Sequence, residues 1–127
     1  MILVDTSIWI DHFRHGDVEL RKVIADDLLL CHPVVVGELA LGSLRDRGAV
    51  MAFFSAQREA LVASHYEVIT MIGRHSIFSM GIGYTDAHLL ASILLDRRSL
   101  LWTRDKRLAA AARKAGASLY APTSAPN

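Results

Sequence analysis

Three short runs of apolar residues without polar alternation constrain this chain more than any other feature of its sequence. They cover residues 2–4, 28–31 and 99–103, and longer stretches of helical character separate them. Strands of a parallel sheet are buried on both faces, so they occur as continuous apolar runs. Strands that alternate with helices favour the α/β class. We therefore expect a short, mostly parallel central sheet flanked by helices.

Helical patterns fill most of the chain between these runs. Asp17 is placed to cap a helix, Pro33 suits a first helical turn, and Gly116 is placed to end the last helix. Thr85 is expected to cap the most apolar helix. The expected helices cover residues 7–13, 18–24, 33–44, 49–63, 66–78, 87–95 and 106–115, and residues 117–120 are expected to form a last short strand.

The composition is that of a compact globular protein. Apolar residues make up 52% and charged residues 21% of the 127 residues, as in folded soluble domains. No repeat or linker interrupts the chain, so we expect one domain over residues 1–127, with 121–127 as a loose tail. The single cysteine, Cys31, excludes an internal disulfide and suits the reducing cytoplasm. The longest weakly charged run, residues 77–95, contains Asp86 and His88 and favours a buried helix over a membrane span.

Four acidic residues occupy equivalent places relative to the expected strands. Asp5 ends the first strand and Asp105 lies just beyond the third. Glu38 lies in the helix that follows the second strand, and Asp86 lies in the first turn of the apolar helix. In open α/β sheets, sites form beyond the carboxyl ends of the strands. We therefore expect these four carboxylates to converge at one edge of the sheet.

Converging carboxylates repel one another unless a cation neutralises them. Magnesium prefers oxygen ligands and is commonly held by a few carboxylates together with substrate phosphate. Such a metal can polarise a phosphoryl oxygen and generate hydroxide. Ser7 and Thr103 lie beside the same edge and are placed to orient the carboxylates or a metal-bound water. The pattern favours metal-assisted cleavage of a phosphodiester.

Basic residues surround this expected site. The chain carries 14 Lys and Arg against 13 Asp and Glu, and setting four acids aside as a site leaves nine acids against those 14 cations. A mildly basic body around an acidic pocket suits a polyanion that meets a metal there. Candidates for contacts to the phosphates of such a polyanion are Arg45, Arg104, Lys106 and Arg107, together with Arg47.

Each of these features also has a purely structural interpretation. Asp105 is placed to cap the helix that follows it, and Asp86 suits the first turn of a helix. Three other classes of protein therefore stay open: a phosphotransfer receiver-like domain, a non-catalytic RNA- or partner-binding module, and a structural subunit without a metal. A receiver-like pocket requires a second acid near the first strand end, and Asp5-Thr6-Ser7 does not supply it.

Four segments of the chain resemble the motifs of PIN-domain ribonucleases, and most closely those of VapC-type toxins. The segments are "ILVDTSIWID", "VVVGELALG", "GYTDAHLLA" and "LLWTRDKRL", and the resemblance extends from Ile2 to about Tyr120. It implies a PIN-like three-layer α/β sandwich and an endoribonuclease dependent on Mg²⁺ or Mn²⁺. It also implies that Asp5, Glu38, Asp86 and Asp105 form the metal site, with Ser7 and Thr103 as accessory hydroxyls.

The resemblance has implications for partners as well. Members of this family are usually homodimers that act on RNA. A small VapB-like antitoxin neutralises them by placing a basic side chain in the acidic pocket. Contact with DNA is expected only through that antitoxin, and no membrane contact is expected.

Overall fold

The computed structural model describes residues 1–122, and the expected sheet lies at their centre. Its strands are β1 (Ile2–Val4), β2 (Leu29–Leu30) and β3 (Leu100–Trp102), in the order β2-β1-β3. Both pairings are parallel, with Leu3 opposite Leu30 on one side and Leu101 on the other. All three strands therefore end at the same edge of the sheet, as the apolar runs predict.

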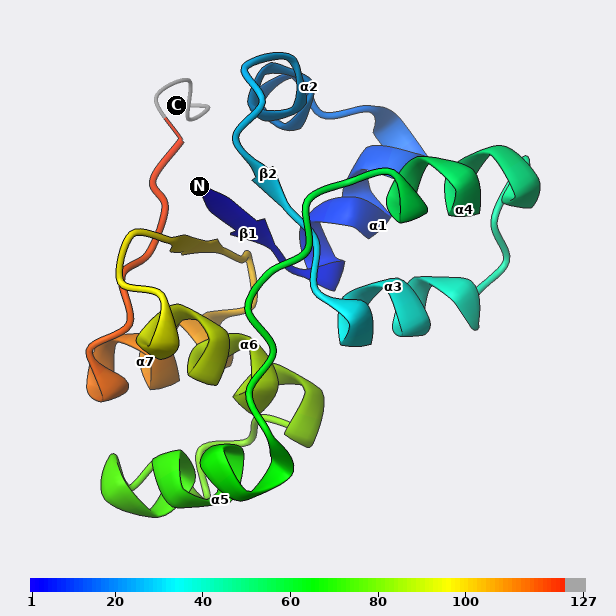
Figure 1. The fold of residues 1–127 in the computed structure, drawn as a ribbon. Helices are drawn as coiled ribbons and strands as arrows, with labels where there is room; N and C mark the ends of the chain where they lie inside the picture. The colour runs from blue at the N-terminus through cyan, green and yellow to red at the C-terminus, as the bar shows by residue number, and fades with distance from the viewer. Residues whose placement is uncertain (123–127) are drawn as a thin grey trace.

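Seven helices surround the sheet in the described part of the chain. They are α1 (Thr6–His15), α2 (Val18–Ala25), α3 (Pro33–Ala40), α4 (Arg47–Ser55), α5 (His65–Arg74), α6 (Tyr84–Leu95) and α7 (Lys106–Ala115). Figure 1 shows α1–α4 gathered toward one side of the molecule and α5–α7 toward the other. The architecture is the α/β arrangement expected from the sequence. None of these helices is long and apolar enough to cross a bilayer.

Burial explains why α6 lacks an amphipathic pattern. Residues 87–93 of this helix are all buried, and Leu90 has no exposed surface. The helix packs against β3, α5, α7 and α3, so apolar side chains are needed all around it. It begins at Tyr84, and Thr85 does not cap it; the Asp86 carboxylate instead accepts a hydrogen bond from the amide of Gly83, the N-cap residue. The start of α6 is therefore held in part by Asp86 itself.

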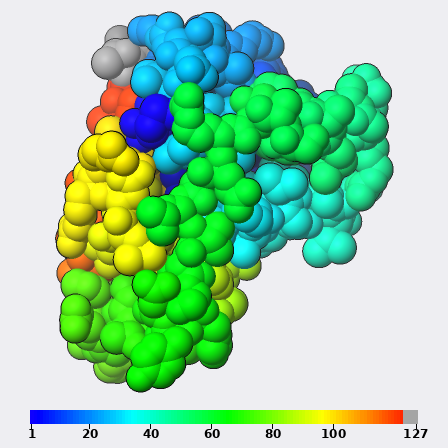
Figure 2. Space-filling view, in the orientation of Figure 1, coloured from blue at the N-terminus to red at the C-terminus, as the bar shows by residue number. Residues whose placement is uncertain are grey.

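The helix expected over residues 49–63 is wrong in its second half. Helix α4 ends at Ser55, and the chain then runs extended past β2, where Cys31 forms a parallel bridge with Glu59. The amide of Cys31 donates to the carbonyl of Arg58, and the amide of Ala60 donates to the carbonyl of Cys31. An unpaired strand edge favours such pairing. In Figure 2 this green segment runs over the surface from α4 down to α5.

Further boundaries also differ from expectation. Helix α5 ends at Arg74 rather than at residue 78. Helix α3 ends at Ala40 rather than at residue 44, and the guanidinium of Arg47 donates to the Ala40 carbonyl at 2.6 Å. Residues 117–120 form no strand of their own. They contribute one parallel bridge, between Leu101 and Leu119. Most of the expected loose tail, residues 123–127, lies outside the described residues.

Candidate active site at the carboxyl edge of the sheet

Asp5 is a buried carboxylate at the point where β1 becomes α1. Its side chain is only 4% exposed. One oxygen accepts hydrogen bonds from the Ser7 amide at 2.9 Å, the Ser7 hydroxyl at 2.5 Å and the Ile8 amide at 3.4 Å. The other oxygen accepts from the Thr103 hydroxyl. Both oxygens are thus held in fixed directions at the N-terminus of α1, where the helix dipole favours a negative charge.

Two opposing effects set the protonation of Asp5. Burial raises the pKa of this carboxyl group, and the hydrogen bonds from Ser7, Thr103 and Ile8 act against that rise. Burial is the larger effect. Keeping a carboxyl group here therefore lowers the stability of the folded state. Such a cost is unusual for a residue that only caps a helix.

The two hydroxyl residues named from the sequence both lie against Asp5. Thr103, which follows β3, also accepts a hydrogen bond from the Asp105 amide at 3.0 Å. Ser7 accepts a hydrogen bond from the Arg104 amide at 3.1 Å. Each hydroxyl donates to Asp5 and accepts from the backbone after β3, so the ends of β1 and β3 are joined through this carboxylate.

The other three acids lie on different elements around this junction. Glu38, on α3, accepts a hydrogen bond from the Thr6 hydroxyl at 2.8 Å. Asp105 caps α7 and accepts from the amides of Arg107 and Leu108 at 2.9 and 3.2 Å. Asp86 lies in the first turn of α6 and accepts from the Gly83 amide at 3.3 Å. Glu38 and Asp105 are exposed, and Asp86 is partly buried.

Electrostatics link the four acids. The pKa of Asp86 is raised, first by burial and then by the negative charges of Asp105, Asp5 and Glu38, while the Gly83 amide opposes the rise. The charges of three acids from separate parts of the sequence therefore act on Asp86. That all four form one site stays a prediction.

The donor set fits a hard divalent cation. Carboxylate and hydroxyl oxygens are the ligands that Mg²⁺ and Mn²⁺ prefer. Within residues 1–122, no three His, Cys, Asp or Glu side chains stand close enough to hold a metal together. Each carboxylate instead makes the local hydrogen bonds given above. Magnesium commonly takes only one or two protein carboxylates and completes its shell with water and phosphate, so an open, hydrated site fits these residues.

Arg104 is not available as a free phosphate contact. Its guanidinium pairs with Asp11 at 2.8 Å and with Asp17 at 2.5 Å, and it lies over the ring of Trp102 at 5.7 Å. Asp17 also caps α2 through a hydrogen bond from the Leu20 amide. We call this arrangement the Arg104 clasp. It ties the end of β3 to α1 and to the start of α2, a role that the sequence alone did not indicate.

The remaining basic candidates lie around the acidic edge. Lys106 and Arg107 begin α7, directly after Asp105, and both are exposed. The Arg107 side chain packs over Gly81, where an added Cβ would come within 3.0 Å of the Arg107 Cδ. Arg45 lies in a groove of about 1000 Å³ between α1 and the segment after α3, and Thr6 and Glu38 line the same groove. The sequence did not reveal this groove, because its walls come from two separate segments.

A cluster of aromatic and imidazole rings lies behind Asp86. The Tyr84 hydroxyl and His65 Nδ1 are 2.6 Å apart, and the Tyr84 ring packs edge-on against His88 at 4.7 Å. His88 in turn lies 5.8 Å from His32, ring to ring. His32 is fully buried and caps α3 by accepting a hydrogen bond from the Val34 amide. This cluster ties the first turn of α6 to α5 and α3.

Comparisons with known proteins agree with this geometry. The profile of the PIN domain family matches residues 2–114. Two curated proteins named Ribonuclease VapC32, from Mycobacterium tuberculosis strains CDC 1551 / Oshkosh and ATCC 25618 / H37Rv, are each 44% identical to this chain over 119 residues. The aligned region covers 94% of this chain and 96% of each relative.

Proposed function

Because the chain belongs to the PIN domain family, we propose that it is a metal-dependent endoribonuclease and the toxin of a toxin–antitoxin pair. The observation that carries the proposal is the buried carboxylate of Asp5, fixed by two hydroxyl groups at the edge where Asp86, Glu38 and Asp105 raise the local negative charge. The kinship with proteins named as VapC ribonucleases supports RNA as the substrate.

The proposed roles follow from how each side chain is held. Asp5 and Asp86 are the more buried acids and would hold Mg²⁺ or Mn²⁺ in place, while Glu38 and Asp105 would complete the site from its exposed side. The hydroxyl groups of Ser7 and Thr103 hold the Asp5 oxygens in fixed directions. The bound metal would polarise a phosphoryl oxygen and activate the attacking water. Because the acids are fixed by hydrogen bonds, little reorganisation is needed when substrate binds.

The basic residues divide into two groups in this proposal. Arg45, Lys106 and Arg107 are exposed and adjacent to acidic-site elements, so they are proposed to contact phosphates that flank the cut. Arg104 is proposed to position the β3 end instead, because Asp11 and Asp17 already neutralise it.

The partners belong to the same proposal. A small VapB-like antitoxin would neutralise the protein by placing a cation among the four acids, where the charges are complementary. We propose a cytoplasmic homodimer that meets DNA only through that antitoxin. Coexpression with the protein encoded beside it should give a tight complex, and expression alone should arrest growth.

The direct test is to incubate purified protein with total RNA and to map new 5′ ends. Wild-type protein should produce discrete ends with Mg²⁺ and none with EDTA, and Asp5→Asn should produce none. Asp26→Asn, at an exposed acid at the end of α2, is the matched control and should cleave normally. Equal cleavage by Asp5→Asn and wild type would refute the proposed site. RNA binding without new ends would instead indicate a non-catalytic module.

A further inference from the structure

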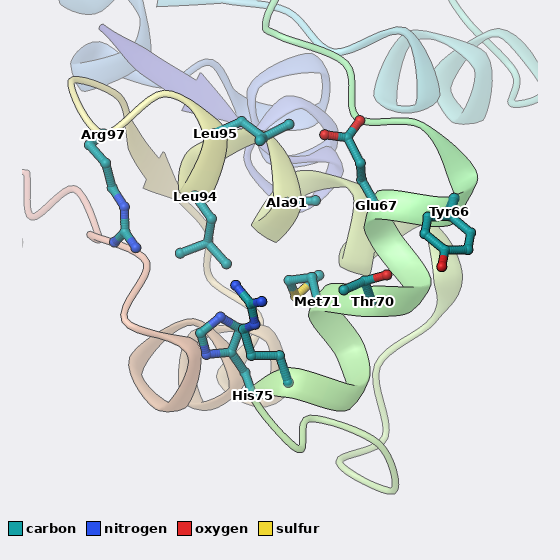
Figure 3. Close-up of a pocket in the computed structure, with 10 residues that line it drawn as sticks. Tyr66, Glu67, Thr70, Met71, His75, Ala91, Leu94, Leu95 and Arg97 are labelled. Carbon is teal, nitrogen blue, oxygen red and sulfur yellow. The ribbon is translucent and has the colours of Figure 1, made fainter.

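A second groove lies between α5 and α6, away from the acidic edge. It has a volume of about 380 Å³. Met71, Ala91, Leu94 and Leu95 form an apolar floor, as Figure 3 shows, with Tyr66 and Glu67 toward one end and His75 and Arg97 toward the other. Arg74 also lines this groove.

The end of the groove near His75 is basic. The Lys114 side chain, from α7, lies beside this end, because its Nζ donates to the carbonyl of Ser76, the residue after His75, at 2.9 Å. Arg97 donates to the Gly116 carbonyl at 2.9 Å. Arg74, Arg97 and Lys114 are all exposed, and none pairs with a carboxylate in residues 1–122. We call these three residues the basic end of the groove.

The nearest acids are engaged elsewhere. Glu67 accepts a hydrogen bond from the Ser64 amide in the capping box that begins α5. Asp96 pairs with Arg98 and accepts from the Ser99 hydroxyl. The basic end therefore carries three positive charges that form no ion pair with a described carboxylate, and Glu67 lies toward the other end of the apolar floor.

The basic end is distant from the proposed cut. Helix α6 runs from Asp86 at the acidic edge to Leu95 in the groove. At about 1.5 Å per residue, these positions are separated by roughly 14 Å along the helix axis. A ligand that contacts both places therefore has to extend beyond the nucleotides at the cut.

We propose that the α5–α6 groove is a second contact site for the RNA substrate, remote from the cut. It would take an unstacked nucleotide from a loop or bulge, with the base on the apolar floor and neighbouring phosphates on Arg74, Arg97 and Lys114. This inference rests on the proposed function and narrows it, because it makes nucleotides away from the cut part of what the protein recognises.

The charges favour RNA over a second copy of the chain. A two-fold axis through the middle of the groove would set the basic end of one copy against the Glu67 end of the other, where one hydrogen-bonded carboxylate would face three cations. A groove of this size also admits a single nucleotide more readily than a packed helix. Phosphate supplies the missing negative charge at regular spacing.

The test measures RNA binding in the Asp5→Asn background, which prevents cleavage. The probe is unfractionated transfer RNA, and the variant is Arg74→Gln with Lys114→Gln. The matched control is Lys22→Gln with Arg58→Gln, two exposed cations on α2 and on the segment after α4. We expect the groove variant to weaken binding about tenfold and to lower the slope of log K against log salt by roughly 1.5, at about 0.7–0.9 per phosphate contact. The control should do neither.

Cleavage kinetics separate this site from the acidic edge. In otherwise wild-type protein, the groove variant should raise KM for the full-length substrate and leave kcat unchanged. The shortest oligonucleotide that is still cleaved should show no change. Arg74→Glu removes no hydrogen bond seen in residues 1–122 and should reproduce the effect if the double variant folds poorly.

Three outcomes would overturn the inference. They are equal weakening by the control variant, an equal loss on the shortest oligonucleotide, and a change of oligomeric state in the groove variant, which would make the groove an interface between copies. If wild-type protein cleaves no RNA at all, the proposed function fails, while the binding comparison still tests the groove.

Discussion

At the scale of single residues, position in the chain predicts more than residue type. Asp5, Ser7 and Thr103 could be selected from the sequence because they directly follow strands whose ends must meet. The partners of Arg104 could not, because Asp11 and Asp17 lie 93 and 87 residues earlier in the chain. The sequence around Arg104 is basic, which favours a surface that binds RNA, and only the fold brings two carboxylates to it.

Replacing Asp5 by asparagine should not destabilise the protein when metal is absent. Burial raises the pKa of Asp5, so the folded state disfavours its charge at pH 7, and asparagine removes that charge while it keeps an oxygen for the helix cap. The melting temperature of Asp5→Asn should equal or exceed that of wild type. Asp5→Ala loses the cap and should cost about 0.5–2 kcal/mol. Thermal unfolding in EDTA tests this, and equal losses in both variants would contradict it.

At the scale of helices and strands, capping residues and helix propensity predict an element correctly where no tertiary contact competes with them. Helix α7 begins and ends where its sequence predicts, with Asp105 as its cap and Gly116 in the left-handed conformation after it. The helix predicted over residues 56–63 does not form, because backbone pairing with the strand edge at Cys31 outweighs helix propensity. The predicted start of α6 is late because Asp86, not Thr85, bonds the N-cap amide of Gly83, and because Tyr84 contacts His65. Tertiary contacts of this kind cannot be predicted from a short stretch of sequence.

His32, which caps α3, should make the protein sensitive to acid. Burial and the nearby His88 lower the pKa of His32 to about 4, from 6.5 in an unfolded chain. Between these values the unfolded state binds a proton that the folded state does not, so stability should fall by about 3 kcal/mol from pH 6.5 to pH 4. The raised pKa values of Asp5 and Asp86 act in the opposite direction over the acidic range.

The variant His32→Asn isolates this contribution. Asparagine is a good helix cap and does not titrate, so the variant should lose stability at pH 7 through a cavity but show a flatter decline toward pH 4. Urea unfolding at several pH values measures the difference. His15→Asn, at an exposed position, is the control and should follow wild type. Parallel curves for His32→Asn and wild type would show that His32 does not titrate as argued.

At the scale of the whole molecule, the class of fold and the place of the site follow from the order of strands and helices. The sequence does not predict the groove beside Arg45 or the one between α5 and α6, because their walls come from distant segments. The chain also closes on itself, since the Tyr120 hydroxyl donates to Glu19 at 2.5 Å. Contacts between residues so far apart in the sequence depend on the packing of the folded protein, and no sequence motif predicts them.

Magnesium or manganese should stabilise the folded protein as a whole. Burial, and after it the charges of Asp105, Asp5 and Glu38, raise the pKa of Asp86, and an extended chain largely escapes this charge repulsion. A metal present at about 100 times its dissociation constant would add roughly 2.7 kcal/mol by mass action. The melting temperature should therefore rise with either metal, and the rise should shrink in Asp86→Asn. A melting temperature that neither metal changes would contradict a metal site at this edge.

The hydrogen bond from Thr103 to Asp5 also has a consequence during translation. These residues are 98 positions apart, and β1 gains its partner β3 only from the same late part of the chain. At about 5–20 residues per second, a ribosome adds Thr103 roughly 5 to 20 s after Asp5. A nascent chain thus carries Asp5 for most of its synthesis without one of the two hydroxyl groups that orient it. The messenger RNA being read, and the ribosome itself, would meet a competent nuclease only when the protein is almost complete.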